Sequence, residues 1–116
     1  MQQQPVVLDP AALDRLRKTV GGDTAVLAEL IDSFLEDAPK LLTTLQQVSE
    51  KSDAAGVRLA AHSLKSNAAD FGAMHFSNLC KELERLGKAG TLDGATALVE
   101  QVEVEYGKVR VALEAL

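Results

Sequence analysis

One of the two histidines in the sequence, His62, has neighbours suited to phosphoryl chemistry. On a helix, Lys65 and Ser66 lie one turn after the imidazole, and Arg58 lies one turn before it. A neutral imidazole nitrogen is a competent nucleophile near neutral pH. With a neighbouring ammonium to offset negative charge, His62 is suited to attack an activated phosphoryl group and form a phosphohistidine.

The position of His62 relative to the surrounding apolar residues indicates that it faces solvent. The apolar stripe of this segment is centred between Ala61 and Leu64. At about 100° per residue, the imidazole then points roughly 140° away from that centre. Three small or apolar residues share the exposed side: Ala55, Leu59 and Ala69. A lone surface histidine often has no role, but this flat, partly apolar surface suits the approach of a large partner.

The apolar pattern around this site predicts an all-α chain. A short helix is expected to begin at Asp9-Pro10 and to end at Gly21-Gly22. Apolar stripes with helical spacing follow over residues 27–48, 57–71, 76–86 and 95–116. Short connections make successive helices antiparallel, so we expect an up-down-up-down four-helix bundle with the short helix over one end. Residues 1–8 are expected to be a flexible lead-in, and residues 9–116 the domain.

Several local features sharpen this prediction. Pro39 is expected to kink or locally break its helix, and Gly87 and Gly90 are expected to loosen the end of the helix over residues 76–86. Residues 102–106 alternate like a strand, but nothing else in the chain offers a strand partner, so we predict a helix. The stripe over residues 27–48 comprises Leu27, Leu30, Ile31, Phe34, Ala38, Leu41, Leu45 and Val48. Three glutamates are expected to be solvated: Glu100, Glu103 and Glu105.

Composition and charge exclude several classes of protein. The 116 residues carry a formal net charge of −5 with a pI near 4.9, which argues against a nucleic-acid binder. A single Cys rules out an internal disulfide, and we expect no structural zinc site. No apolar run approaches the roughly 18 residues of a membrane span, and residues 1–5 do not resemble a signal peptide. We expect a soluble cytoplasmic protein, or a soluble piece of a larger one.

Two other residues could in principle carry chemistry. His75 has no lysine three residues later, so we expect a surface or capping role. Cys80 lies on an apolar stripe and is expected to be a buried small hydrophobe without a redox role. A metal-binding bundle is not supported, because no Glu-x-x-His pair faces an interior.

Three segments together resemble the histidine-containing phosphotransfer (HPt) domain family. They read His-Ser-Leu-Lys-Ser-Asn-Ala over residues 62–68, Phe-Gly-Ala over 71–73 and Cys-Lys-Glu-Leu-Glu over 80–84. The likeness extends over nearly the whole chain through Phe34-Leu35, Ala38-Pro39 and Tyr106. Ser66 is the main departure, since the family usually has Gly there. Serine is small, and its hydroxyl could hydrogen-bond a phosphoryl oxygen.

This resemblance implies a phosphoryl shuttle in a multistep two-component phosphorelay. His62 would accept a phosphoryl group from the aspartyl phosphate of one response-regulator receiver domain and pass it to the Asp of another. Lys65 would offset the phosphate charge, and Lys88 would add positive potential. Glu84 falls where the family often has a Gln or Glu bonded to the imidazole; an acceptor at Nδ1–H leaves Nε2 free to attack. Alternatively, Glu84 is a surface carboxylate paired with Lys81 or Lys88.

The chain is accordingly interpreted as a carrier and not as an enzyme. It has no Gly-rich phosphate loop and no paired carboxylates placed for a metal ion. Phosphoryl transfer usually needs one, so we expect Mg²⁺ to come with the partner receiver domain.

The partners implied are receiver domains, with a hybrid sensor kinase as a further candidate. Their footprint should centre on His62 and include Leu35, Ala55, Arg58, Leu59, Ser66 and Ala69. We expect a monomer that binds no nucleic acid and no membrane. The competing hypothesis is a non-phosphorylated HPt-like helical module that docks a signalling partner; phosphate incorporation from a phosphorylated receiver separates the two.

Overall fold

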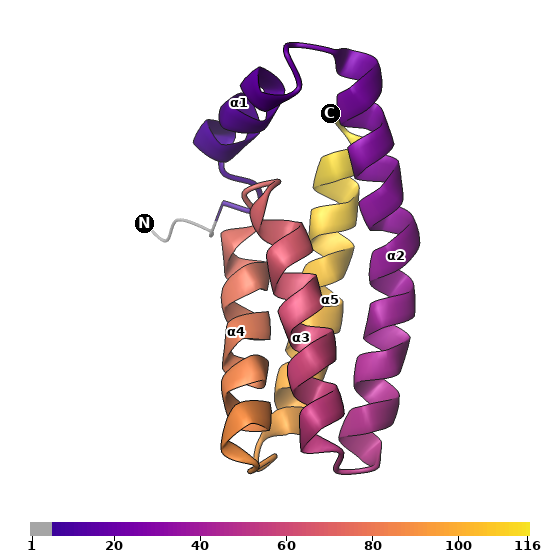
Figure 1. Ribbon diagram of the computed structural model, residues 1–116, viewed down its shortest axis with the longest axis vertical. Coiled ribbons are helices and arrows are strands. Elements are labelled where there is room, and N and C mark those ends of the chain that lie inside the picture. The colour runs from indigo at the N-terminus through magenta and orange to yellow at the C-terminus, as the bar shows by residue number, and fades with distance from the viewer. Residues whose placement is uncertain (1–5) are drawn as a thin grey trace.

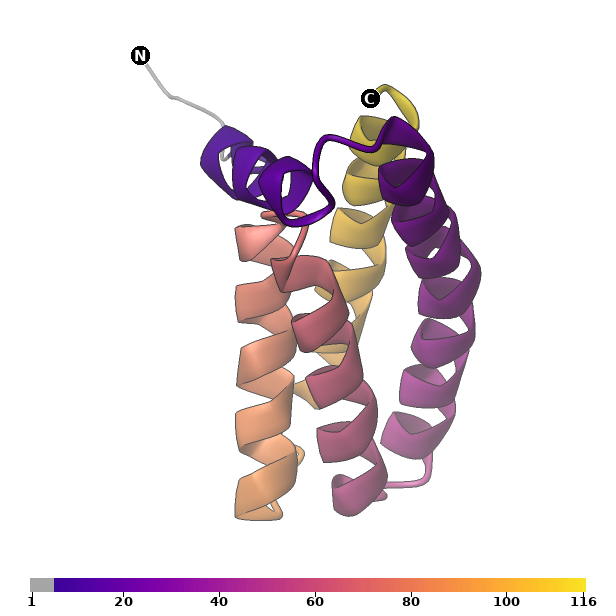
Figure 2. The same cartoon turned by 45° about the horizontal axis from the view of Figure 1, so that its top comes forward.

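The computed structural model describes residues 6–116 and contains, over these residues, five helices and no strand. The helices are α1 (Pro10–Thr19), α2 (Thr24–Glu50), α3 (Ala54–Ala69), α4 (Met74–Ala89) and α5 (Ala95–Glu114). Helices α2 to α5 run alternately down and up, and α1 lies across one end beside the α3–α4 turn (Figures 1 and 2). The predicted all-α four-helix bundle with a short N-terminal helix is confirmed.

Aspartates begin the first three helices. The carboxylate of Asp9 accepts the backbone N–H of Ala11 at 3.0 Å, and that of Asp53 accepts Gly56 N–H at 3.0 Å. Asp23 likewise accepts two N–H groups at the start of α2. Each bond satisfies a donor that has no partner within the helix. These caps determine where α1, α2 and α3 begin.

The turn between α3 and α4 also holds α1. Gly72 adopts a positive φ of 75°, and its carbonyl accepts the Asp9 N–H at 2.9 Å. A Cβ at this position would lie only 2.8 Å from the Cβ of Ala12. Both the backbone conformation and the close approach therefore require glycine.

The core consists mainly of Leu, Val and Ala, with an aromatic cluster toward the α1 end. Phe34 contacts Phe71 and Tyr106 with ring centroids 5.4 and 6.1 Å apart, and Tyr106 also contacts Phe76. Such tilted pairs are favourable beyond their burial of area. The largest fully buried side chains are Phe76, Leu45, Leu64, Leu83, Leu113, Val57, Val102, Val109 and Cys80. Helix α3 thus has a rigid apolar base on the side opposite to the one it exposes.

The kink or local break predicted at Pro39 is wrong. Helix α2 continues from Thr24 to Glu50, and Figure 2 shows it as one gently curved ribbon. Pro39 has no backbone N–H, so the carbonyl of Leu35, one turn earlier, loses its helical hydrogen-bond partner. Pro39 is exposed, and this carbonyl lies toward the same side of α2. Meanwhile Ala38 is buried and anchors this turn to the core.

Some predictions about individual side chains are also wrong. Leu30 is exposed at the edge of its stripe, beside a pocket, and the unpredicted Leu42 is buried instead. Leu116 lies beyond the end of α5 and is exposed. Glu105 is only 5% exposed, because it follows the buried Val102 by three residues on the core-facing side of α5. Its carboxylate lies 3.6 Å from the Lys108 ammonium.

The N-terminal boundary differs slightly from the expectation. Residues 1–5, most of the predicted lead-in, lie outside the described residues. Leu8 is buried in the hydrophobic core, and Val7 packs against it. The packed structure therefore begins before Asp9. In the part of the chain described, no helix is both long and apolar enough to cross a bilayer.

Candidate functional site

Helix α3 presents His62 near the middle of its length, on the side facing away from the core. The His62 side chain is 59% exposed. Below it, Ala61 and Leu64 are fully buried. The exposed position predicted from the apolar stripe is confirmed.

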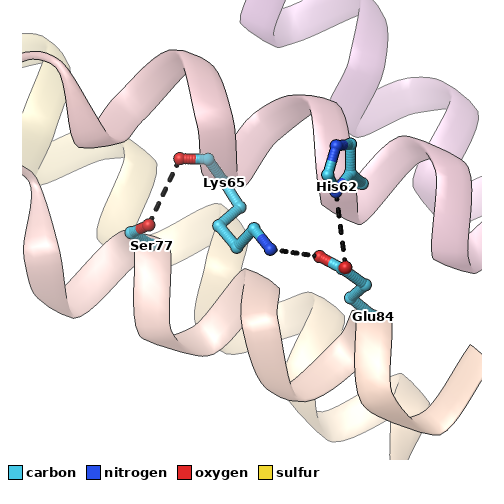
Figure 3. A network of polar contacts seen from close by, with 4 residues as sticks. All are labelled: His62, Lys65, Ser77 and Glu84. Carbon is cyan, nitrogen blue, oxygen red and sulfur yellow. Dashed lines mark hydrogen bonds and ion pairs between the residues drawn. The ribbon is translucent and has the colours of Figure 1, made fainter.

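Glu84, on α4, bridges two residues of α3 (Figure 3). Its Oε1 lies 3.3 Å from Nδ1 of His62, and its Oε2 lies 2.7 Å from Nζ of Lys65. Over residues 6–116, Glu84 makes a hydrogen bond with His62 and an ion pair with Lys65, and no ion pair joins it to Lys81 or Lys88. The carboxylate therefore faces the imidazole and not the lysines of its own helix.

The charge of Glu84 is stabilised by these contacts. The hydrogen bond from the Lys65 ammonium is the largest effect and lowers the pKa of the Glu84 carboxyl below its ordinary value of 4.5. Burial opposes this by a smaller amount, and the hydrogen bond with His62 lowers the pKa further, by less than burial raises it. An anionic acceptor at Nδ1 favours the tautomer that carries its proton on Nδ1. In Figure 3 the other ring nitrogen points away from Glu84. Nε2 is then the ring nitrogen with a free lone pair.

Lys65 is more constrained than a surface lysine. Its side chain is 27% exposed, and its ammonium contacts Glu84 and not the imidazole. The Lys65 carbonyl accepts a hydrogen bond from Ser77 Oγ at 3.2 Å. Both ends of the residue are thus tied to α4, one turn from His62.

The other predicted site residues surround His62 in varying degrees of exposure. Ser66 is exposed one turn after the imidazole, and Lys88 is exposed one turn beyond Glu84. Among the predicted docking residues, Ala55, Arg58 and Leu59 are exposed, and Leu59 is 60% exposed. Leu35 and Ala69 are half-buried. Ala69 is less open than expected, because it is the last residue of α3, where the chain turns toward α4.

Three features near the site were not predicted from the sequence. Ser77 is buried on α4 and bonds α3, although its neighbours in the sequence suggested only an apolar stripe. Gly87 does not loosen the end of α4 but packs within it against α3; a glycine inside a helical pattern is the signal that could have indicated this.

A pocket of about 170 Å³ also opens between α1, α2 and the end of α3, lined by Leu16, Leu30, Ser33, Phe34, Asp37, Asn67, Asp70 and Phe71.

The remaining candidate residues are separate from this site. His75 is exposed near the start of α4 and lines an open groove between α4 and α5. Cys80 is fully buried, and burial raises the pKa of its thiol to about 12. Among residues 6–116, His, Cys, Asp and Glu side chains form no group of three or more that could hold a metal ion.

Comparison with known proteins gives consistent matches. The Hpt domain family model matches residues 29–115. Histidine-containing phosphotransfer proteins 2 and 5 of Arabidopsis thaliana are 24% and 26% identical, over 80% and 82% of this chain. The chain spans 62% of the length of each of these two relatives. The crystal structure of histidine-containing phosphotransfer protein B (HptB) from Pseudomonas aeruginosa PAO1 is 32% identical, with a TM-score of 0.86 over 97% of this chain and 95% of that one.

Proposed function

Because this chain belongs to the Hpt domain family, we propose that it carries phosphoryl groups in a multistep phosphorelay, with His62 as the phosphoacceptor. The observation that carries the assignment of His62 is the contact between Glu84 Oε1 and His62 Nδ1 on an otherwise exposed imidazole. A nucleophilic histidine needs one nitrogen accessible and the other held by an acceptor. His62 meets both requirements.

In the proposed reaction, the Nε2 lone pair of His62 attacks the phosphorus of a receiver aspartyl phosphate. The N–P bond forms as the P–O bond to the aspartyl carboxylate breaks, and that carboxylate leaves with the bonding electrons. Positive charge develops on the imidazole ring, where Nδ1–H faces the anionic Glu84. A preorganised acceptor of this kind stabilises the developing charge. The reverse reaction with a second receiver passes the phosphoryl group on.

Basic and polar residues around His62 would stabilise the phosphoryl group once it is bound to the imidazole. We assign Lys65 to offset its charge, since the ammonium is held one turn from the imidazole by Glu84. Ser66 is exposed one turn after His62, and its hydroxyl could donate to a phosphoryl oxygen. Arg58 and Lys88, both exposed, add positive potential nearby.

The proposal assigns the metal ion to the partner. Phosphoryl transfer is usually assisted by Mg²⁺, which prefers carboxylate oxygens. We assign that ion to the acidic site of the receiver domain. The chain then acts as a carrier with no nucleotide site of its own.

The proposed docking surface comprises Leu35, Ala55, Arg58, Leu59, Ser66 and Ala69 around His62. The partners are response-regulator receiver domains and a hybrid sensor kinase. The contact should be modest in area and short-lived, because a shuttle has to release each partner quickly. The proposal includes a cytoplasmic location and a monomeric carrier.

The test is incubation with a receiver domain phosphorylated on its aspartate, followed by intact-mass measurement. The expected result is the mass of one phosphoryl group on this chain, labile in acid and stable in alkali. Binding of the receiver without any phosphate incorporation would instead support the competing hypothesis of a non-phosphorylated docking module.

A further inference from the structure

The contact between Glu84 and His62 depends on the separation of α3 and α4, and the geometry points to Gly87 and Ser77 as the positioning residues that set it. Helices α3 and α4 form the most extensive helix–helix contact among the described residues. Gly87 follows Glu84 by three residues, and Ser77 precedes it by seven. They touch α3 on either side of the level at which Glu84 meets His62. The catalytic consequence of this inference rests on the proposed function, whereas its structural part does not.

Gly87 marks a close approach of the two helices. It is buried in α4, and a Cβ there would lie 2.7 Å from the Ala54 carbonyl oxygen. The same Cβ would lie 2.8 Å from the backbone nitrogen of Arg58 and 2.9 Å from its Cβ. These atoms belong to the backbone of α3 or are fixed to it, so they cannot rotate away. Any side chain at this position would push the helices apart.

Arg58 connects this contact to the site, because it lies one turn before His62 on α3. Glu84 lies one turn before Gly87 on α4. The turn that Gly87 packs against is therefore adjacent to the turn that presents the imidazole. The 3.3 Å separation of Glu84 Oε1 and His62 Nδ1 is already at the long end of hydrogen-bond distances. A further separation of α4 from α3 would break this contact.

Ser77 joins the helices on the other side of Glu84. Its buried hydroxyl donates to the Lys65 carbonyl at 3.2 Å (Figure 3). Lys65 is also the residue whose ammonium holds the second carboxylate oxygen of Glu84. The Ser77 hydroxyl therefore holds the backbone of Lys65, one of the two partners of Glu84. Gly87 sets the distance from α4 to the turn before His62, the other partner.

The chain offers a matched control for Gly87 in Gly107. Gly107 also lies within a helix, α5, and a Cβ there would meet nothing within 4 Å. Gly87→Ala and Gly107→Ala add the same methyl group with the same gain in helix propensity. Only the first adds it between α3 and α4.

The first measurement needs no phosphate. The ¹⁵N chemical shifts of the His62 ring nitrogens, recorded at a pH where the ring is neutral, report which nitrogen carries the proton, and His75 serves as an internal reference. In the parent and in Gly107→Ala we expect the Nδ1–H form to predominate. In Gly87→Ala we expect a shift toward the Nε2–H form, as in Glu84→Ala. Ser77→Ala, which adds no bulk, should shift the tautomers in the same direction but less.

The second measurement is single-turnover phosphoryl transfer from a phosphorylated receiver. We expect Gly87→Ala to be slower than Gly107→Ala by about tenfold, the scale of losing a charge-assisted hydrogen bond or a well-oriented group. Parent-like tautomers in a folded Gly87→Ala would overturn the inference. If that variant does not fold, parent-like tautomers in Ser77→Ala would overturn it instead. If the unmodified chain accepts no phosphate, the proposed function is contradicted. The ¹⁵N measurement of the His62 tautomers still tests the roles of Gly87 and Ser77 in that case.

Discussion

Glu84 Oε1 lies 3.3 Å from Nδ1 of His62, although the two residues are 22 positions apart and on different helices. The other carboxylate oxygen is paired with Lys65, the residue one turn after His62. One side chain of α4 thus connects the imidazole and the ammonium of α3 before any phosphoryl group arrives. In the proposed reaction, such preorganisation means that no rearrangement is needed to orient the imidazole.

Replacing His62 by glutamine should abolish phosphate incorporation and leave the fold intact. The side chain is exposed, so we expect the free energy of unfolding to change by no more than about 0.5 kcal/mol. Intact mass after incubation with a phosphorylated receiver measures the first effect, and urea denaturation the second. His75→Gln is the control and should incorporate phosphate normally. Acid-labile phosphate on the His62 variant would identify a different acceptor.

Lys65→Ala should slow phosphoryl transfer without eliminating it. The attacking nitrogen remains, while the neighbouring positive charge and its ion pair with Glu84 are lost. Because Lys65 is partly exposed, we expect a loss of about tenfold, less than the roughly 100-fold or more that follows removal of a buried oxyanion donor. Single-turnover rates in both directions measure it, with Lys40→Ala on α2 as the control. Equal rates for the two variants would show that Lys65 has no role in phosphoryl transfer.

The pH dependence of stability should reveal the charge on Glu84. Its pKa is lowered in the folded chain, chiefly by Lys65 and further by His62, from an ordinary value of 4.5. A lowered folded-state pKa stabilises the fold at pH values above 4.5, and this contribution disappears as the pH falls through the folded-state value. Carboxyl ¹³C shifts should show Glu84 titrating below 4.5 in the parent and closer to it in Lys65→Ala. Identical titration curves in the two proteins would contradict the ion pair.

Leu59→Glu should weaken receiver binding by about tenfold or more, because docking would bury an unpaired charge. Val104→Glu is a matched control: both side chains are highly exposed, at 60% and 66%, but Val104 lies on α5. Neither change should alter stability much. Receiver titrations followed by amide chemical shifts measure affinity and footprint together. Shifts clustered on α5, or equal affinities for the two variants, would place the docking surface elsewhere.

Cys80 should resist alkylation in the folded protein. Burial raises the pKa of its thiol to about 12, so almost no thiolate exists at neutral pH and reagents cannot reach the sulfur. Iodoacetamide labelling should therefore proceed only as fast as the protein unfolds, and should become rapid in denaturant. Fast labelling of a fully folded sample would indicate an opening of α4 that the structure does not show.

Much of the fold was predictable because helix formation is largely local. The caps at Asp9, Asp23 and Asp53 and the spacing of apolar residues determine where helices begin and which side each one buries. The same local geometry was sufficient to predict that His62 faces solvent. It failed at Pro39, where burial of the adjacent turn outweighs the local preference against a helical proline.

The angular position of each side chain on its helix follows from the local sequence, because 3.6 residues per turn is a property of the backbone. The distances between helices, by contrast, depend on how the helices pack together. From the sequence alone, Glu84 could pair with Lys81 or Lys88 on its own helix. Because α3 packs close to α4, Glu84 contacts His62 and Lys65 instead. That approach depends on the close packing of Gly87 against a turn 29 residues earlier in the chain, at Arg58. No local pattern specifies such a contact, because it results from many side chains of distant segments packing together.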